Sequence, residues 1–174
     1  MSCNLVPYRG WGFIWHLGFL ENWGKRVAMT NKEQELINQY PGSQAIIAMA
    51  RDTWAGSKLS IKIELPVSDR LKEKLCELLG KNIDKIFFTD NDVRHIKNHH
   101  GQGEEKRGQV NIVPADLALI PVVLNEYDKV DNTDTDKLGN KKILFIKNID
   151  NLIYVASVER GNNQIGVISL WKKK

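Results

Sequence analysis

The stretch that decides the fold is 142-KILFIKNIDNLIYVASVERGNNQIGVISLW-171, near the C-terminal end of the 174-residue chain. It contains three apolar runs, at 142–148, 152–160 and 164–171, separated by the turn-forming sequences NIDN and GNNQ. Apolar runs bounded by Asn, Asp and Gly are typical of β-strands. Connections this short join neighbouring antiparallel strands. Together with a shorter run at 127–130, the stretch predicts a four-stranded antiparallel meander.

Upstream of this meander, the chain is predicted to form helices with one strand among them. Thr30 and Glu33 have the spacing of a capping box, which predicts a helix that ends before the sequence YPG. The segments 43–56 and 68–80 each begin with Ser and end with Gly, and both are expected to be helices. Between them, KLSIKIEL at 58–65 alternates apolar and polar residues, which is typical of a half-buried strand.

Two further helices are predicted before the meander. A short apolar run, IDKIFFTD at 83–90, leads into a helix that Asp90 caps and that extends to Gly101. The segment VPADLALIPVVLNE at 113–126 is expected to be the second helix, with Pro121 kinking or restarting it.

These elements predict an α+β protein in which helices pack on a four-stranded antiparallel sheet, preceded by a helical region with one strand. The boundary is placed after residue 66, giving an N-terminal helical and aromatic region, 1–66, for delivery or docking, and a second domain, 67–174. Hydrophobic residues make up 42% of the chain, enough for a folded core.

The charge of the chain permits a polyanionic partner without requiring one, since the net charge is only +4. The cations gather in the C-terminal part, where two acidic residues, Asp150 and Glu159, stand against Lys141, Lys142, Lys147, Arg160, Lys172, Lys173 and Lys174. Solvated strand faces with a lysine tail produce the same pattern, so charge alone does not decide the function.

The N-terminal residues carry an aromatic pattern of their own. Aromatic residues at every fourth position would form one stripe on a helix: Trp11, Trp15, Phe19 and Trp23. Such a stripe packs on the body of the domain, on a membrane surface or on a partner. No segment reaches the roughly 18 uninterrupted apolar residues that a membrane span needs, so no stable membrane insertion is expected.

The cysteines indicate the compartment. Cys3 and Cys76 are too few for a disulfide framework, and we expect two separate reduced thiols. Reduced thiols favour a cytoplasmic site of action.

Three of the chain's four histidines lie in DVRHIKNHHG at residues 92–101. At 3.6 residues per turn, His95 and His99 are about 40° apart on the predicted helix, and Asp92 lies near the same line one turn earlier. His100 falls in the neighbouring apolar sector, so it is expected to pack or hydrogen-bond at its edge. His95 and His99 are therefore expected to face a common cleft.

The histidines have three interpretations. Zinc binding normally requires three or four protein ligands, so Asp92 or a distant carboxylate would have to complete the set begun by His95 and His99. No pattern in the sequence supplies that ligand, and no metal or cofactor is assigned. Acid–base chemistry on RNA requires two groups that exchange protons near neutral pH, together with cations or donors for the phosphate. Surface histidines near the C-terminal end of a helix are the third interpretation.

The order of the parts resembles a known group of nucleases. A short apolar entry, a helix with HIKNHH, a helix with ALIPVVLNEYDKV, then ILFIK, LIYVASVE and VISLW resemble the phage-associated branch of the barnase, EndoU, colicin and RelE-like (BECR) nuclease superfamily, over about residues 83–171. Its members typically set one or two helices against a four-stranded antiparallel sheet, and many are metal-independent endoribonucleases.

The resemblance also implies site residues. The branch's "HI" pair and second histidine match His95, Ile96 and His99, although its usual Arg before the second histidine is Asn98 here. Lys147 and Ser169 fall where the superfamily places polar active-site residues. Asp92 is expected to orient an imidazole, and the predicted substrate contacts are Arg94, Lys97, His100 and Arg160.

The resemblance thus implies a metal-independent endoribonuclease of phage or toxin type that cleaves RNA, with tRNA as one candidate, by 2′-hydroxyl attack. His95 and His99 would share the base and acid roles in either order, Lys147 would offset phosphate charge, and Ser169 would donate a hydrogen bond. An immunity, antitoxin or capsid protein is the expected protein partner, with delivery to the cytoplasm by a phage particle or a secretion system.

Two alternatives remain at this level. One is a non-enzymatic phage structural or interaction module that docks through residues 1–28 and does not need the histidines. The other is a zinc-dependent hydrolase.

Overall fold

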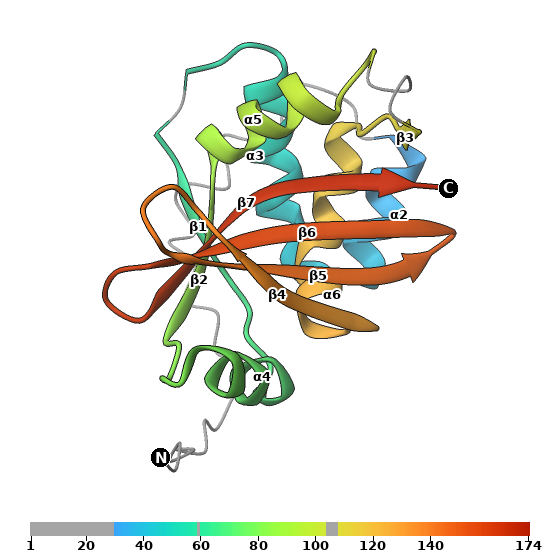
Figure 1. Ribbon diagram of the computed structural model, residues 1–174. Coiled ribbons are helices and arrows are strands. Elements are labelled where there is room, and N and C mark those ends of the chain that lie inside the picture. The colour runs from blue at the N-terminus through green and yellow to red at the C-terminus, as the bar shows by residue number, and fades with distance from the viewer. Residues whose placement is uncertain (1–29, 59, 104–107) are drawn as a thin grey trace.

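The structure, a computed structural model, describes residues 30–58, 60–103 and 108–174 (Figure 1). These residues form the α-helices α2 (Asn31–Gln39), α3 (Gln44–Trp54), α4 (Asp69–Leu79), α5 (Asp90–His100) and α6 (Ile120–Asn125). The strands are β1 (Lys62–Leu65), β2 (Lys85–Thr89), β3 (Gln109–Val110), β4 (Lys129–Thr135), β5 (Lys141–Ile149), β6 (Asn151–Arg160) and β7 (Gln164–Lys173). Two 3-10 segments, Pro41–Ser43 and Pro114–Leu119, complete the set. The predicted α+β class is confirmed.

The helix boundaries follow capping signals in the sequence. Thr30 and Glu33 form the predicted capping box at the start of α2. Ser68 accepts a hydrogen bond from the backbone N–H of Leu71 at the start of α4. Gly80 ends α4 with a left-handed φ of 71°, a conformation that glycine adopts without steric cost.

The described strands form one sheet in the order β1-β2-β7-β6-β5-β4, with β3 also paired to β7. The four C-terminal strands are antiparallel neighbours, as the short turns predicted. The prediction of a four-stranded antiparallel sheet is wrong in extent, because β2 joins parallel to β7 and β1 joins antiparallel to β2. Local alternation reveals that a strand forms but not which distant strand it pairs with.

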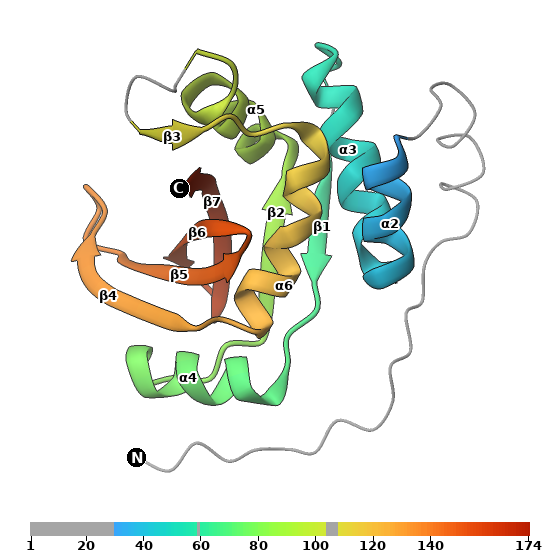
Figure 2. The ribbon, with the colours of Figure 1, turned by 90° about the vertical axis from the view of Figure 1, so that its right-hand side faces the viewer.

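Helices α2, α3 and α6 lie on one face of the sheet, here called the covered face (Figure 2). Alternate residues of β5, β6 and β7 point to it and are at most 1% exposed: Ile143, Phe145, Ile153, Val155, Val167 and Leu170. The same hydrophobic cluster includes Ile46 of α3 and Ile63 of β1. The described part of the predicted N-terminal region, residues 30–65, therefore shares one core with the sheet.

The opposite face of β4–β7 is here called the open face. Among the described residues no helix crosses it, and α5 lies alongside its β7 edge (Figure 1). It carries partly buried side chains that alternate with those of the core: Leu144, Ile146, Tyr154 and Trp171.

A bulge in β7 sets which residues reach the open face. Ala156 of β6 pairs with Ser169 and Ser157 pairs with Val167, so Ile168 is an extra residue on β7. Because successive side chains alternate, Ser169 and Trp171 share the open face beyond the bulge.

The sequence also led to expectations about the aromatic stripe, the cysteines and membrane insertion. The predicted aromatic stripe from Trp11 to Trp23 lies outside the described residues, as does Cys3. Cys76 is disulfide-bonded, so the expectation of a reduced thiol there is wrong; sequence separation gives no measure of distance in the fold. Within residues 30–58, 60–103 and 108–174, no helix combines the length and apolar character needed to cross a membrane.

Candidate active site

Helix α5, which carries the histidines, is fixed at both ends. Thr89 caps its N-terminus in a box with Asp92, whose Oδ2 accepts a hydrogen bond from the Thr89 backbone at 2.9 Å. The predicted cap, Asp90, is instead the first helical residue and accepts a hydrogen bond from the backbone just before β1. At the other end, a β-carbon at Gly101 would collide with a carbonyl oxygen of the preceding turn, so glycine is required there.

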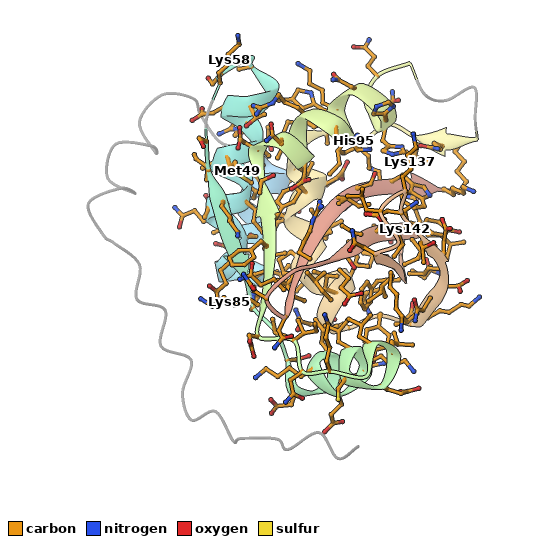
Figure 3. All side chains as sticks on the ribbon, turned by 60° about the vertical axis from the view of Figure 1, so that its left-hand side comes forward. Met49, Lys58, Lys85, His95, Lys137 and Lys142 are labelled. Atoms are coloured by element: carbon orange, nitrogen blue, oxygen red, sulfur yellow. The ribbon has the colours of Figure 1, made fainter. Side chains whose placement is uncertain are left out.

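The three histidines of α5 form one cluster beside the open face. The rings of His95 and His99 lie 4.4 Å apart between centroids, and His100 lies 6.5 Å from each. His95 and His99 are exposed and His100 is partly buried. Figure 3 shows His95 on α5 above the strands, with Lys142 of β5 below it. The predicted adjacency of His95 and His99 is confirmed.

A ladder of aromatic rings joins this cluster to the sheet. His100 stacks on Trp171 at 5.6 Å, and Trp171 stacks on Tyr154, its neighbour across β6 and β7, at 5.2 Å with 3° between the ring planes. Lys173 places its ammonium 5.6 Å from the Tyr154 ring centroid. The sequence predicted no role for Trp171, since its partner across the sheet depends on register.

His100 is also held by a hydrogen bond. Its Nδ1 lies 2.8 Å from Oε1 of Gln109, a residue of β3 that pairs opposite Lys173. Its backbone oxygen accepts a hydrogen bond from Ile112 at 2.9 Å. The expectation that His100 packs or hydrogen-bonds at the edge of the apolar sector is confirmed on both counts.

A hollow of about 290 Å³ lies on the open face next to Trp171. Leu144, Ala156 and Ile168 contribute apolar lining, and Asp131, Asp134 and Lys142 contribute charge. Lys142 and Asp134 form an ion pair at 3.3 Å. The hollow and the histidine cluster thus share Trp171 as a common wall.

Burial and neighbouring charges shift the pKa of His95, the first histidine of α5. Partial burial lowers the pKa of His95, and the neighbouring His99 and His100 lower it further, whereas Asp92 acts in the opposite direction. Burial raises the pKa of Asp92, opposed by hydrogen bonds from Thr89 and by the charges of Arg160 and His95. His95 is therefore neutral at pH 7 and able to accept a proton.

Ser169 lies on the same face as Trp171 and is only 6% exposed. Its hydroxyl has no hydrogen-bond partner among the described residues. A buried hydroxyl without a partner costs free energy, and the Oγ atom of Ser169 is closed to solvent in the structure.

Comparison with known proteins identifies a family for this chain. A family model described as phage-Barnase-EndoU-ColicinE5/D-RelE like nuclease matches residues 66–174. The chain belongs to this family. The match supports nuclease activity for the chain. It covers the histidine helix α5 and strands β2–β7 of this BECR-like nuclease. No curated protein and no solved structure matches the chain.

In this BECR-like nuclease, Lys147 does not lie with the histidines. It pairs with Ile153 of β6, which pairs with Lys172 of β7, so all three point to the covered face. Its ammonium donates a hydrogen bond to the backbone oxygen of Glu126 at 2.8 Å and lies 3.8 Å from the Asp128 carboxylate.

The predicted convergence of Lys147 with His95 and His99 is therefore wrong. Lys147 shares one face of the sheet with Ile143 and Phe145, because alternate residues of β5 point the same way. The histidine cluster, however, faces the other side of the sheet, a placement that no local pattern encodes.

Two more predicted substrate contacts point elsewhere. Arg94 forms an ion pair with Asp90 at 2.6 Å, and Lys97 donates a hydrogen bond to the backbone oxygen of Trp54 at the end of α3. Lys97 therefore ties α5 to α3, whereas the contacts of Arg94 with Asp90 and Asn91 stay within α5. Of the four predicted substrate contacts, His100 lies with the histidine pair, Arg94 and Lys97 are engaged elsewhere, and Arg160 acts through its charge on Asp92.

A metal site was one of the three interpretations of the histidines. In the part of the chain that the structure describes, no three or more His, Cys, Asp or Glu side chains are arranged to hold a metal ion. Asp92, the nearest carboxylate in sequence, is engaged by the backbone and hydroxyl of Thr89.

Proposed function

We propose that the chain is a metal-independent endoribonuclease that cleaves RNA by attack of the 2′-hydroxyl on the adjacent phosphate. The observation that carries the proposal is the cluster of three imidazoles beside an open sheet face, with ring centroids 4.4 and 6.5 Å apart. Imidazole is the side chain that both takes and gives protons near neutral pH. Membership of a nuclease family supports this use of the cluster.

The reaction requires a base for the 2′-hydroxyl proton, an acid for the 5′-oxygen and donors for the charge that develops on the phosphate. His95 is assigned as the base because its lowered pKa leaves the imidazole neutral at pH 7. A protonated histidine of the same cluster is the acid. Because histidines perform both proton transfers, the chemistry does not depend on a metal ion.

Two groups, Arg160 and Ser169, are assigned to stabilise the negative charge on the phosphate. Arg160 is close enough to Asp92 for its charge to affect that carboxylate, which in turn affects His95. Ser169 carries a buried hydroxyl toward the open face that has no hydrogen-bond partner among the described residues. Asp92, anchored by Thr89, stabilises the positive charge that His95 acquires on taking the proton.

The test uses an RNA oligonucleotide and intact tRNA in EDTA-containing buffer. The expected products carry a 2′,3′-cyclic phosphate on one side and a 5′-hydroxyl on the other. A matched oligonucleotide with 2′-deoxyribose at the cleaved position should resist, since it lacks the nucleophile. A His95→Ala sample prepared in the same way controls for contaminating nucleases. Cleavage of the deoxy substrate at the same rate, or complete loss of activity in EDTA, would reject the mechanism.

A further inference from the structure

The spacing of the three imidazoles separates them into a close pair and a distant member. His95 and His99 are 4.4 Å apart between centroids, which is ring contact, and no phosphate group fits between them. His100 stands 6.5 Å from both. An in-line displacement presents the attacking and leaving oxygens on opposite sides of phosphorus, so the base and the acid must stand apart.

We propose that His100 is the general acid of the reaction, acting opposite His95, and that Gln109 and Trp171 are the residues that position it. The assignment rests on the endoribonuclease function proposed above. It replaces the expectation that His95 and His99 divide the two proton transfers between them, and it moves His100 from substrate binding to catalysis.

The hydrogen bond to Gln109 determines which nitrogen of His100 transfers the proton. The amide oxygen Oε1 only accepts, so Nδ1 of His100, 2.8 Å away, is the donor in this contact. Nε2 is therefore the nitrogen that carries or releases the exchangeable proton. A fixed partner on one ring nitrogen is the usual way in which a catalytic histidine is held in one tautomer.

Trp171 holds the ring plane of His100. The indole is stacked on Tyr154 at 5.2 Å and on His100 at 5.6 Å. Its contribution is to fix the distance and orientation of His100 relative to His95.

The proton transfers balance in this arrangement. Neutral His95 removes the proton from the 2′-hydroxyl as the 2′-oxygen forms a bond to phosphorus. The bond between phosphorus and the 5′-oxygen breaks, and Nε2 of protonated His100 transfers its proton to that oxygen. The products are a 2′,3′-cyclic phosphate and a 5′-hydroxyl, with His95 protonated and His100 neutral until solvent restores both.

A substrate with sulfur in place of the bridging 5′-oxygen separates acid from base, because a thiolate leaves without protonation. The substrate is an RNA oligonucleotide with the sulfur at the linkage that the wild-type protein cleaves. His100→Ala should lower cleavage of the oxygen substrate by at least about 10²-fold but that of the sulfur substrate by less than about 10-fold. His95→Ala should impair both substrates by at least about 10²-fold.

The controls separate the two proposals. Equal defects of His100→Ala on the two substrates, or sulfur rescue of His99→Ala instead, would overturn the assignment of His100. No cleavage of either substrate by the wild-type protein would reject the endoribonuclease function and the assignment with it. Because alanine removes a stacked ring, His100→Gln with a wild-type melting temperature serves as the second variant and should show the same sulfur rescue.

The positioning role has its own test. In Gln109→Glu a carboxylate accepts the Nδ1 hydrogen bond and stabilises the imidazolium, so the basic limb of the pH–rate profile should move to higher pH. Trp171→Phe should retain most of the activity, whereas Trp171→Ala should lose it on the oxygen substrate and regain it on the sulfur substrate. An unchanged pH profile in Gln109→Glu would contradict the contact between Gln109 and the acid.

Discussion

The covered and open faces of the sheet differ in the burial and the partners of their polar side chains. On the covered face, Asp116 is 1% exposed and lies 2.7 Å from Lys172, whose side chain is 11% exposed. On the open face, Ser169 has no partner among the described residues, and the histidine rings contact one another at the edge of solvent. The comparison shows that the charged pair beneath the helices is buried and closed by short contacts, whereas the exposed imidazoles beside the open face contact mainly one another.

The largest expected effect is on the covered face. Asp116→Asn removes the carboxylate that receives Lys172 at 2.7 Å and Lys32 at 2.8 Å, leaving the Lys172 ammonium buried. Breaking a buried ion pair in this way costs about 3–5 kcal/mol in the free energy of unfolding. Chemical denaturation of the purified protein measures it.

Lys32→Met is the matched control, because the Lys32 side chain is 55% exposed and should contribute less than about 1 kcal/mol. Burial opposes ionisation of Asp116, but hydrogen bonds from Lys172, Lys32 and Val113 prevail and lower its pKa below 3.8. Its stabilisation is therefore present above that pH and is lost as the pH falls through the folded-state pKa. Equal acid sensitivity of wild type and Asp116→Asn would contradict this.

The second effect belongs to the open face. His95→Ala should lower RNA cleavage by at least about 10²-fold, the lower end of acid–base contributions. The melting temperature should change little, because the imidazole is exposed. If His95→Ala did not fold, His95 would be needed for stability, and the proposed difference between the two faces would be contradicted.

A smaller effect is expected for Lys147, which the sequence placed in the site. Lys147→Met removes a hydrogen bond to the backbone of Glu126 and should cost about 1 kcal/mol of stability. Cleavage should stay within about twofold of wild type, since the loss lies far below the range for a catalytic group. A loss approaching that of His95→Ala would restore Lys147 to the active site.

The smallest effects are shifts in the acid limb of the pH–rate profile, which follows the pKa of His95. His99 lowers this pKa and Asp92 raises it. His99→Asn should therefore move the limb to higher pH, and Asp92→Asn should move it to lower pH. Shifts in the same direction would show that the two residues act through the fold rather than through charge.

Much of the local structure was predictable because its causes are local. Thr30 with Glu33, and Ser68 with Gly80, mark helix ends through backbone hydrogen bonds within a few residues. The pairing of β5, β6 and β7 followed from turns only a few residues long. The adjacency of His95 and His99 followed from the helical period.

The candidate site was predictable only in part. The sequence identified the histidine helix, but the roles of Trp171 and Gln109 depend on the bulge in β7 and on the pairing of β3. Lys147 was assigned to the site from its place in the superfamily's order of strands, which does not specify the face of the sheet to which its side chain points.

By itself, the sequence determined where helices and strands form and which histidines share a side of α5, since helix caps and side-chain periods act over a few residues. Only the tertiary structure decided that β2 enters the sheet parallel to β7, that α5 lies beside the open face and that His100 meets Trp171. These arrangements depend on register and packing between distant segments, and a single slip of register moves every side chain of a strand to the opposite face.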